Sequence, residues 1–239
     1  MLAEAFVRAG HHAGDRLIPP SPANPNGFFE DLDVNAANDD LLGTLDTLEG
    51  TLRPPRHLWW LGAFVGPSTT SAGAAEAARR AELVPERPFV LKDPRFSHTM
   101  PSWPTLQPAL KIVMVRSPSE VGASLRAMAA LAESNPLFDA SVEHCAAMWS
   151  ATYRSILDWC DASTIFLDVR ALRDGTALPR LRDATGTELN VDHVSSRLHR
   201  QVRASSECRV ERCVLDGVRD RLAMHDFNHR LPVLGRDES

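Results

Sequence analysis

The sequence has no excess of positive charge and no hydrophobic run long enough to cross a membrane. Lysine and arginine together number 26, against 31 aspartates and glutamates, which gives a formal net charge of −5. Binding along a nucleic-acid backbone needs a positive field, so this balance predicts no nucleic-acid partner. A membrane-spanning helix needs roughly 18 or more consecutive apolar residues, and the sequence has no such run. A negative net charge is nevertheless compatible with a local basic pocket.

Cysteine is also scarce. The four cysteines form no C-x-x-C pair and have no zinc-site spacing, so we expect reduced thiols and no metal site. The N-terminal residues lack the basic and apolar regions of a signal peptide, and together these absences predict a cytoplasmic protein. No G-x-x-x-x-G-K-[ST] loop is present, which disfavours a nucleoside triphosphatase.

The sequence has the composition of a globular protein. Of its 239 residues, 44% are hydrophobic, which is enough for a packed core. A length of 239 residues favours one large domain, which we place at residues 1–234, followed by a polar tail at residues 235–239.

Three short apolar runs predict buried strands of a parallel sheet, because each is continuously apolar rather than alternating. They are Pro88–Asp93, Leu110–Arg116 and Thr164–Arg170. Helical spacing or composition predicts helices near Leu2–Ala9, from a cap at Asp33 to Leu48, and over Ser71–Leu83, Ser119–Glu133 and Ser141–Cys160. This alternation predicts an α/β fold of three layers, α/β/α, around a parallel sheet.

Cations follow two of the three predicted strands. Lys92 and Arg95 stand at or just after the end of the first, and Arg116 ends the second. Ligands of open parallel sheets bind beyond the carboxyl ends of the strands, so this edge predicts an anion site for a phosphate or a sulfate. Ser124, almost two helical turns further on, can point to the same anion. The alternative is that Arg116 pairs with Glu120 and Ser124 packs.

The segment Arg116–Leu125 resembles the 3′-phosphate-binding motif of the sulfotransferases that use 3′-phosphoadenosine-5′-phosphosulfate. Three further segments resemble bacterial members of that family, in the same order along the chain: Ala9–Leu42, Leu91–Arg95 and Asp192–Arg200. The resemblance covers most of the chain from Met1 to about Arg200. It implies a P-loop-like fold, in which Arg116 and Ser124 hold the 3′-phosphate of the donor. It also implies transfer of a sulfuryl group to a hydroxyl of a small-molecule or carbohydrate acceptor.

The sequence departs from this family at its start. The family opens with a buried strand and a glycine-containing loop that cradles the 5′-phosphosulfate, whereas in this chain Met1 stands where the following helix begins. Without that strand we expect unpaired backbone groups and an apolar slot in the sheet. Two interpretations follow, an N-terminally truncated chain or a non-catalytic, degenerate member, and we favour the first. A different anion-using transferase, such as a kinase without its phosphate loop, is a third.

Several residues are candidates for catalysis. Sulfuryl transfer needs a base for the acceptor hydroxyl, and Glu30, after Phe28 and Phe29, is the first candidate. Its alternative role is as a loop carboxylate or helix cap, although Asp33 fits the cap better. Among the histidines, His98 is the best placed as a rival base, ahead of His11 and His12. By resemblance, Lys92 contacts the sulfonate; its alternative is an ion pair with Asp93 or another carboxylate.

Binding roles fall to a further set of residues. Phe28, Trp59 and Arg95 are candidates for the acceptor site, although core packing is the stronger expectation for Trp59. By resemblance, Arg197 and Arg200 reach the donor nucleotide; the alternative is a solvated basic helix face. The composition of these segments does not name an acceptor.

Overall fold

The computed structural model describes residues 2–20, 24, 26–43, 74–131 and 142–190. Within these residues the fold mixes helices with one small parallel sheet of two strands, β1 (Lys111–Val115) and β2 (Thr164–Asp168). Trp59, Arg197, Arg200 and the tail at residues 235–239 lie outside the described residues. Of the helices in the described residues, none is long and apolar enough to cross a membrane.

The sheet confirms two of the three predicted strands and their parallel direction. Lys111 aligns with Thr164 and Val115 with Asp168, so the pairing runs the full length of both strands. In the described part of the connection from β1 to β2 lie two helices, α6 (Pro118–Leu131) and α7 (Val142–Trp159). Both lie close to the ranges predicted from helical spacing, and a connection of this kind suits parallel strands.

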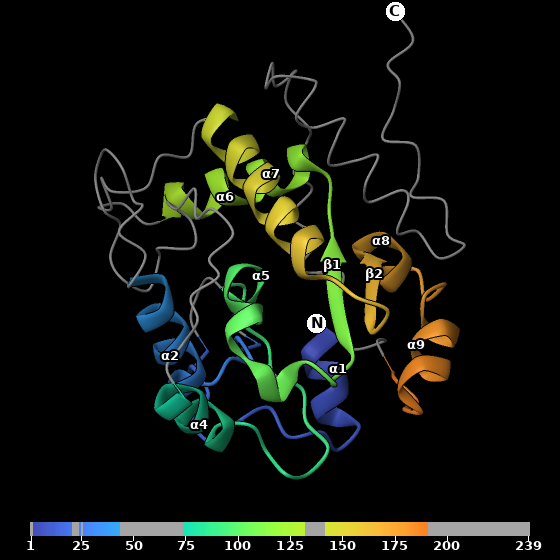
Figure 1. Cartoon of the computed structure of the whole chain (residues 1–239). Coiled ribbons are helices and arrows are strands. Elements are labelled where there is room, and N and C mark those ends of the chain that lie inside the picture. The colour runs from blue at the N-terminus through green and yellow to red at the C-terminus, as the bar shows by residue number, and fades with distance from the viewer. Residues whose placement is uncertain (1, 21–23, 25, 44–73, 132–141, 191–239) are drawn as a thin grey trace, which may run out of the picture.

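Each face of the sheet contributes to a different apolar cluster. On one face, Val113 and Val115 pack against Trp149, Tyr153 and Ile156 of α7. On the other, Leu167 joins a cluster built mainly from three helices, α1 (Leu2–Arg8), α8 (Val169–Arg173) and α9 (Leu178–Thr185). Figure 1 shows β1 and β2 side by side, with α7 beside β1 and α8 beside β2. The alternation of a strand sends successive side chains to opposite faces, so these short strands supply both clusters.

The first apolar run, Pro88–Asp93, is not a strand, and this prediction is wrong. In this segment only Phe89 takes part in a bridge, an isolated parallel one with His12. Continuous apolarity identified a segment whose apolar side chains are half-buried, but not a neighbour with which it could form a ladder. Proline at position 88 has no N–H and cannot donate to one.

The second helix, α2 (Leu32–Gly43), is capped by a different aspartate from the one we expected. Asp31 Oδ1 accepts the backbone N–H groups of Asp33 and Val34 at 2.8 and 3.1 Å, while Asp31 Oδ2 accepts that of Arg16 at 2.9 Å. Asp33 instead pairs with the Arg16 guanidinium at 2.6 Å. Asp31 therefore both caps α2 and ties it to the preceding loop.

The remaining helices pack beside α2. They are α4 (Ala74–Glu82), within the predicted Ser71–Leu83 range, the short α5 (Phe96–Thr99), and the 3₁₀ turns η2 (Met100–Ser102) and η3 (Pro104–Leu106). A third apolar cluster joins Val34 and Leu41 of α2 to Phe96, Met100 and Trp103. Through this cluster, α2 fixes the position of the Lys92–Arg95 turn.

Candidate functional site

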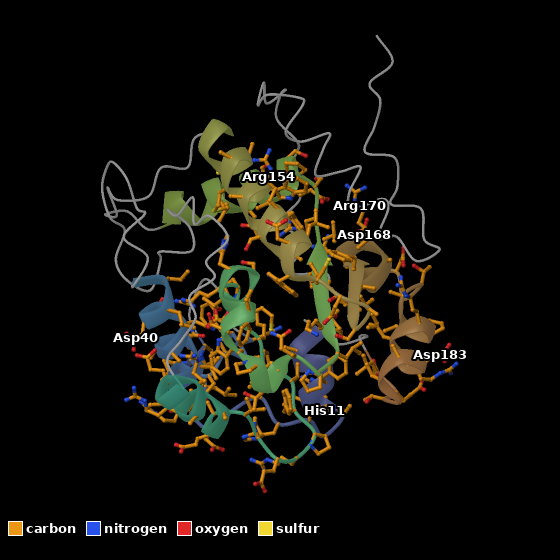
Figure 2. All side chains as sticks on the ribbon, in the orientation of Figure 1. His11, Asp40, Arg154, Asp168, Arg170 and Asp183 are labelled. Atoms are coloured by element: carbon orange, nitrogen blue, oxygen red, sulfur yellow. The ribbon has the colours of Figure 1, made fainter. Side chains whose placement is uncertain are left out.

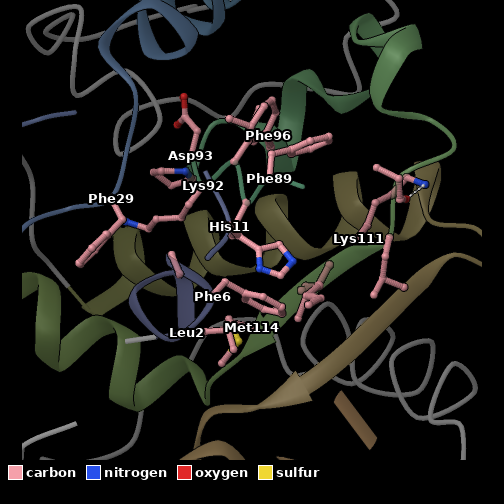
Figure 3. A pocket seen from close by; sticks show the side chains of 18 of the residues that line it. Leu2, Phe6, His11, Phe29, Phe89, Lys92, Asp93, Phe96, Lys111 and Met114 are labelled. Carbon is pink, nitrogen blue, oxygen red and sulfur yellow. Dashed lines mark hydrogen bonds between the residues drawn. The ribbon is translucent and has the colours of Figure 1, made fainter. Parts of the chain in front are cut away.

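A cavity of about 1230 Å³ opens between α1, the extended segment at residues 85–94, β1 and α7. Figure 3 shows side chains from these elements around it, with Leu2, Phe6 and Met114 on one side and Lys92, Phe89 and Phe96 on another. Most of the wall is apolar, and its cations include Lys92, Lys111, Arg116 and Arg173. A large apolar pocket with a few convergent charged groups is the usual form of a ligand site.

Lys92 and Glu30 form an ion pair at this wall. Lys92 Nζ contacts Glu30 Oε1 and also donates to the Phe28 carbonyl at 3.3 Å. The Lys92 side chain is 46% exposed, whereas that of Glu30 is only 8% exposed. Among the described residues, Lys92 lines the cavity and Glu30 does not. Glu30 therefore lies behind Lys92, which matches the alternative of an ion pair with a carboxylate other than Asp93.

The backbone at Phe29, directly before Glu30, is strained. Its φ is +55°, and within the described residues no other non-glycine residue has a positive φ. A side chain in this left-handed region costs free energy, and such residues persist where the surrounding structure holds them. On the other side of Glu30, Asn35 Nδ2 donates to Glu30 Oε2 at 3.1 Å. The carboxylate is thus fixed from both sides, by Lys92 and by Asn35.

Arg116, directly after β1, is a half-buried cation that lines the same cavity. Burial lowers the pKa of its guanidinium, the Glu120 charge raises it, and the Arg173 charge lowers it. Glu120 pairs with Arg170 instead, at 3.0 Å. Within the described part of the chain, Arg116 therefore has no ion-pair partner. An arginine stays charged even with a lowered pKa, so its positive charge is available to an anion.

Arg170 and Asp168 mark the carboxyl end of β2 (Figure 2). Asp168 Oδ1 accepts the Arg170 N–H at 2.6 Å and so begins α8, whose last residue is Arg173. Because α8 starts where β2 ends, the parallel pairing of β1 with β2 places it at the end of the sheet that carries Arg116. Arg173 is exposed, lines the cavity with Arg116, and was not among the residues predicted from the sequence.

Ser124 lies half-buried on α6 and is not among the described residues that line the cavity. Near the start of this helix, the Glu120 N–H donates to Ser117 Oγ at 3.3 Å. The structure therefore brings Arg116, but not Ser124, to the cavity wall.

Two of the candidates lie in the core instead of the cavity wall. Arg95, expected at the acceptor site, is 4% exposed and pairs with Asp39 at 2.6 Å and Asp93 at 3.0 Å. His98, expected as a rival base, is 2% exposed, and burial lowers its pKa to about 4. Since neither side chain lines the cavity, we exclude both from the candidate site.

A buried hydrogen-bond network around Asn38 connects α2 to the segment that follows Lys92. Asn38 Nδ2 donates to Asp93 Oδ2 at 2.8 Å, and Asn38 Oδ1 accepts Thr99 Oγ1 at 2.7 Å and Trp103 Nε1 at 2.8 Å. The network fixes Asp93, the residue next to Lys92. It was missed from the sequence because Asn38 and Asp93 are 55 positions apart.

His11 is a further residue that lines the cavity. Its ring packs edge-on against Phe6, with centroids 5.1 Å apart, and its buried Nδ1 atom has no hydrogen-bond partner among the residues that the structure describes. Figure 3 places the ring among the apolar side chains. The sequence offered His11 as a rival base behind His98, and its ring, unlike that of His98, lines the cavity.

Comparisons with known proteins give no assignment. No protein-family profile, no curated protein and no solved structure matches the chain.

Proposed function

We propose that the protein binds 3′-phosphoadenosine-5′-phosphosulfate and transfers its sulfuryl group to a hydroxyl of a small-molecule or carbohydrate acceptor. The observation that carries this proposal is Arg116, a half-buried cation at the end of a parallel strand, lining a large cavity without a carboxylate partner among the described residues. A guanidinium in this setting suits a phosphate oxygen, and the charge-assisted hydrogen bond is stronger than a neutral one. A P-loop-like, three-layer fold belongs to the same proposal.

In the proposed reaction the protein itself forms no covalent bond to the sulfuryl group. The acceptor oxygen attacks the sulfur, the bond from sulfur to the donor's 5′-phosphate oxygen breaks, and the hydroxyl proton passes to a base. Positioning and cations facing the equatorial oxygens lower such a barrier. In this proposal Lys92 contacts the sulfonate oxygens, and Glu30, fixed by Asn35 behind the cavity wall, holds Lys92 in place. The apolar wall around Phe28 accommodates the acceptor.

Nucleotide binding tests the proposal directly. We expect adenosine 3′,5′-bisphosphate to bind in isothermal titration and to raise the melting temperature, whereas adenosine 5′-monophosphate binds at least tenfold more weakly. Arg116→Ala should weaken bisphosphate binding by about 10- to 100-fold, because a hydrogen bond to a charged group is worth about 1.5–3 kcal/mol. Arg182→Ala removes an exposed arginine from α9 and should leave binding unchanged.

Equal binding of the two nucleotides, or an Arg116→Ala variant that binds like the wild type, contradicts the proposed role of Arg116. Preferential binding of adenosine triphosphate without any need for a 3′-phosphate supports a kinase-like transferase instead.

A non-catalytic binding protein is the second candidate. It is favoured by the position of Glu30, which lies behind Lys92 and does not line the cavity, so it offers no base to an acceptor bound there. Transfer of radiolabelled sulfuryl from the donor to a panel of hydroxyl acceptors separates the two. Bisphosphate binding without transfer to any acceptor identifies the binding protein.

A further inference from the structure

Arg173 is a second arginine of the cavity wall whose charge the described part of the chain leaves without a counter-ion. It lies in the last turn of α8, is exposed and lines the cavity. Among the described residues no carboxylate forms an ion pair with it, whereas Arg170, one turn earlier on the same helix, pairs with Glu120 at 3.0 Å. The Arg173 guanidinium is therefore available to a ligand.

The sheet brings Arg173 close to Arg116. Val115 aligns with Asp168 in the parallel register, so Arg116 and the start of α8 both lie just beyond the same end of the sheet. Both arginines line the cavity, and the charge of Arg173 lowers the pKa of Arg116, as expected of two cations that lie near each other. Like charges repel at short range, and an anion bound between the arginine pair (Arg116 and Arg173) would remove this repulsion.

Glu120, the carboxylate nearest to Arg116 along the chain, is held by other donors. Its Oε1 atom accepts Arg170 Nη2 at 3.0 Å, and its Oε2 atom accepts the Ser117 N–H at 3.3 Å. The Glu120 charge still raises the pKa of Arg116, but Arg170 shares that charge. Glu120 therefore supplies Arg116 with only part of a counter-charge.

Two aspartates at the ends of α8 are also engaged locally. Asp168 Oδ1 accepts the Arg170 N–H at 2.6 Å and caps the helix. Asp174 Oδ1 accepts the Thr176 N–H at 3.0 Å and the Thr176 hydroxyl at 2.6 Å. Within the described residues neither aspartate forms an ion pair with the arginine pair, so this part of the cavity wall keeps a surplus of positive charge.

The charge of the arginine pair suits a phosphate monoester. Such an ester carries a charge of about −2 above its second pKa, near 6, and has three terminal oxygens, enough to accept hydrogen bonds from two guanidiniums. A sulfate ester has the same tetrahedral shape but a single negative charge. Most of the remaining wall is apolar, including Ile156 and Val169, so an ester with an organic group fits the cavity better than the inorganic ion.

We infer that Arg173 is a second phosphate-binding residue beside Arg116, and that the arginine pair selects a phosphate monoester dianion over a monoanion of the same shape. The inference deepens the proposed function and rests on it at one point, the assignment of Arg116 to a phosphate. Under that function the bound group is the 3′-phosphate of the donor. Arg173 then contributes to the discrimination against nucleotides that lack this phosphate.

Phenyl phosphate and phenyl sulfate test the selection by charge, because the two esters have the same shape. Their dissociation constants are measured by NMR titration of the full chain at about pH 8, where the phosphate is a dianion. We expect the wild type to bind phenyl phosphate at least about tenfold more tightly than phenyl sulfate. Arg173→Gln should weaken phenyl phosphate binding about tenfold and phenyl sulfate binding by less than about threefold, because one guanidinium can still hold a monoanion.

Arg182→Gln is the matched control. It also removes one positive charge, but from an exposed position on α9 that does not line the cavity, so both dissociation constants should stay within about twofold of the wild-type values. A wild type without preference for phenyl phosphate overturns the inference. An Arg173→Gln variant that keeps the wild-type preference, or an Arg182→Gln variant that loses as much of it, overturns the inference as well. Urea unfolding of the exposed variant Arg173→Gln should match that of the wild type.

Adenosine 3′,5′-bisphosphate separates this inference from the proposed function. If Arg173→Gln loses the preference for phenyl phosphate while the wild type binds the bisphosphate no better than adenosine 5′-monophosphate, the arginine pair is confirmed and the proposed function fails. If the bisphosphate is preferred and Arg116→Ala weakens its binding, but Arg173→Gln binds both phosphate ligands like the wild type, the function is supported and the role of Arg173 is overturned.

Discussion

Lys92 and Glu30, 62 positions apart in the sequence, form an ion pair in which the cation reaches the cavity and the carboxylate stays behind it. The pair joins the turn after the extended segment to the loop before α2. Because the Glu30 side chain is buried, loss of the Lys92 cation would leave a buried carboxylate without its ion-pair partner.

A double-mutant cycle measures this interaction. We expect Lys92→Met to destabilise the protein more than Lys92→Met combined with Glu30→Gln, because the single change leaves a buried carboxylate without its cation. The coupling free energy should be about 1–2 kcal/mol, measured by urea unfolding of the four proteins. Additivity within about 0.3 kcal/mol would show that the pair contributes nothing to folding.

Substitutions of Asp31 and of its neighbour Asp33 test which aspartate caps α2, with Asp33 as the matched control. Asp31→Ala should lower the free energy of unfolding by about 1–2 kcal/mol, because it removes the cap of α2 and the acceptor for the Arg16 N–H. Asp33→Ala removes an ion pair between exposed side chains and should cost less than about 0.5 kcal/mol. Thermal or urea unfolding followed by circular dichroism decides the order. Equal losses would be inconsistent with Asp31 as the cap.

The buried network around Asn38 should be sensitive to a single substitution. Asn38→Ala leaves the Trp103 indole N–H without its acceptor and takes one donor from Asp93, so we expect a loss of about 2–4 kcal/mol. Tryptophan fluorescence during urea unfolding gives the measurement. Glu82→Gln, at an exposed position of α4, is the control and should change stability by less than about 0.5 kcal/mol. A similar small effect of Asn38→Ala would refute the role of the network.

His98 should make the protein less stable in mild acid. Its folded-state pKa is lowered to about 4 by burial, so below its unfolded value the unfolded chain binds a proton that the folded chain does not. Protonation of His98 therefore does not reduce the free energy of unfolding above about pH 6.5, and it reduces this free energy progressively as the pH falls toward 4. Linkage gives a loss of about 2 kcal/mol between pH 7 and pH 5.

The variant His98→Gln isolates this contribution. Its free energy of unfolding should fall less between pH 7 and pH 5 than that of the wild type, by about the same 2 kcal/mol. If the two proteins lose equal stability over this range, His98 does not titrate as its burial requires.

Patterns in the sequence predicted those parts of the fold that depend on local periodicity. Two apolar runs of the sequence form the strands β1 and β2. The helical spacing of apolar residues in α1, α6 and α7 marks the face that each helix turns to the core. The run at Pro88–Asp93 was equally apolar but formed no strand. Apolarity reports burial, whereas strand formation also needs a partner backbone along the edge.

The candidate site was predictable only in part, because long-range partners decide which charges are available. Arg95 and Arg116 both follow apolar segments, yet Arg95 meets Asp39, 56 positions away, whereas Arg116 is half-buried at the cavity wall. Similarly, Asp31 and Asp33 are both plausible caps, and the loop that brings Arg16 to them determines which one performs that role. Such pairings are set by tertiary structure and leave no periodic signal.

The parallel pairing of β1 with β2 also has a kinetic consequence. Lys111 and Ser163, which meet at the start of the sheet, lie 52 positions apart, so the chain between them must close a long loop before the first hydrogen bond of the ladder forms. Helices α6 and α7 occupy this interval and need only local contacts. The sheet should therefore assemble after its connecting helices, and the refolding rate should be set by the meeting of β1 with β2.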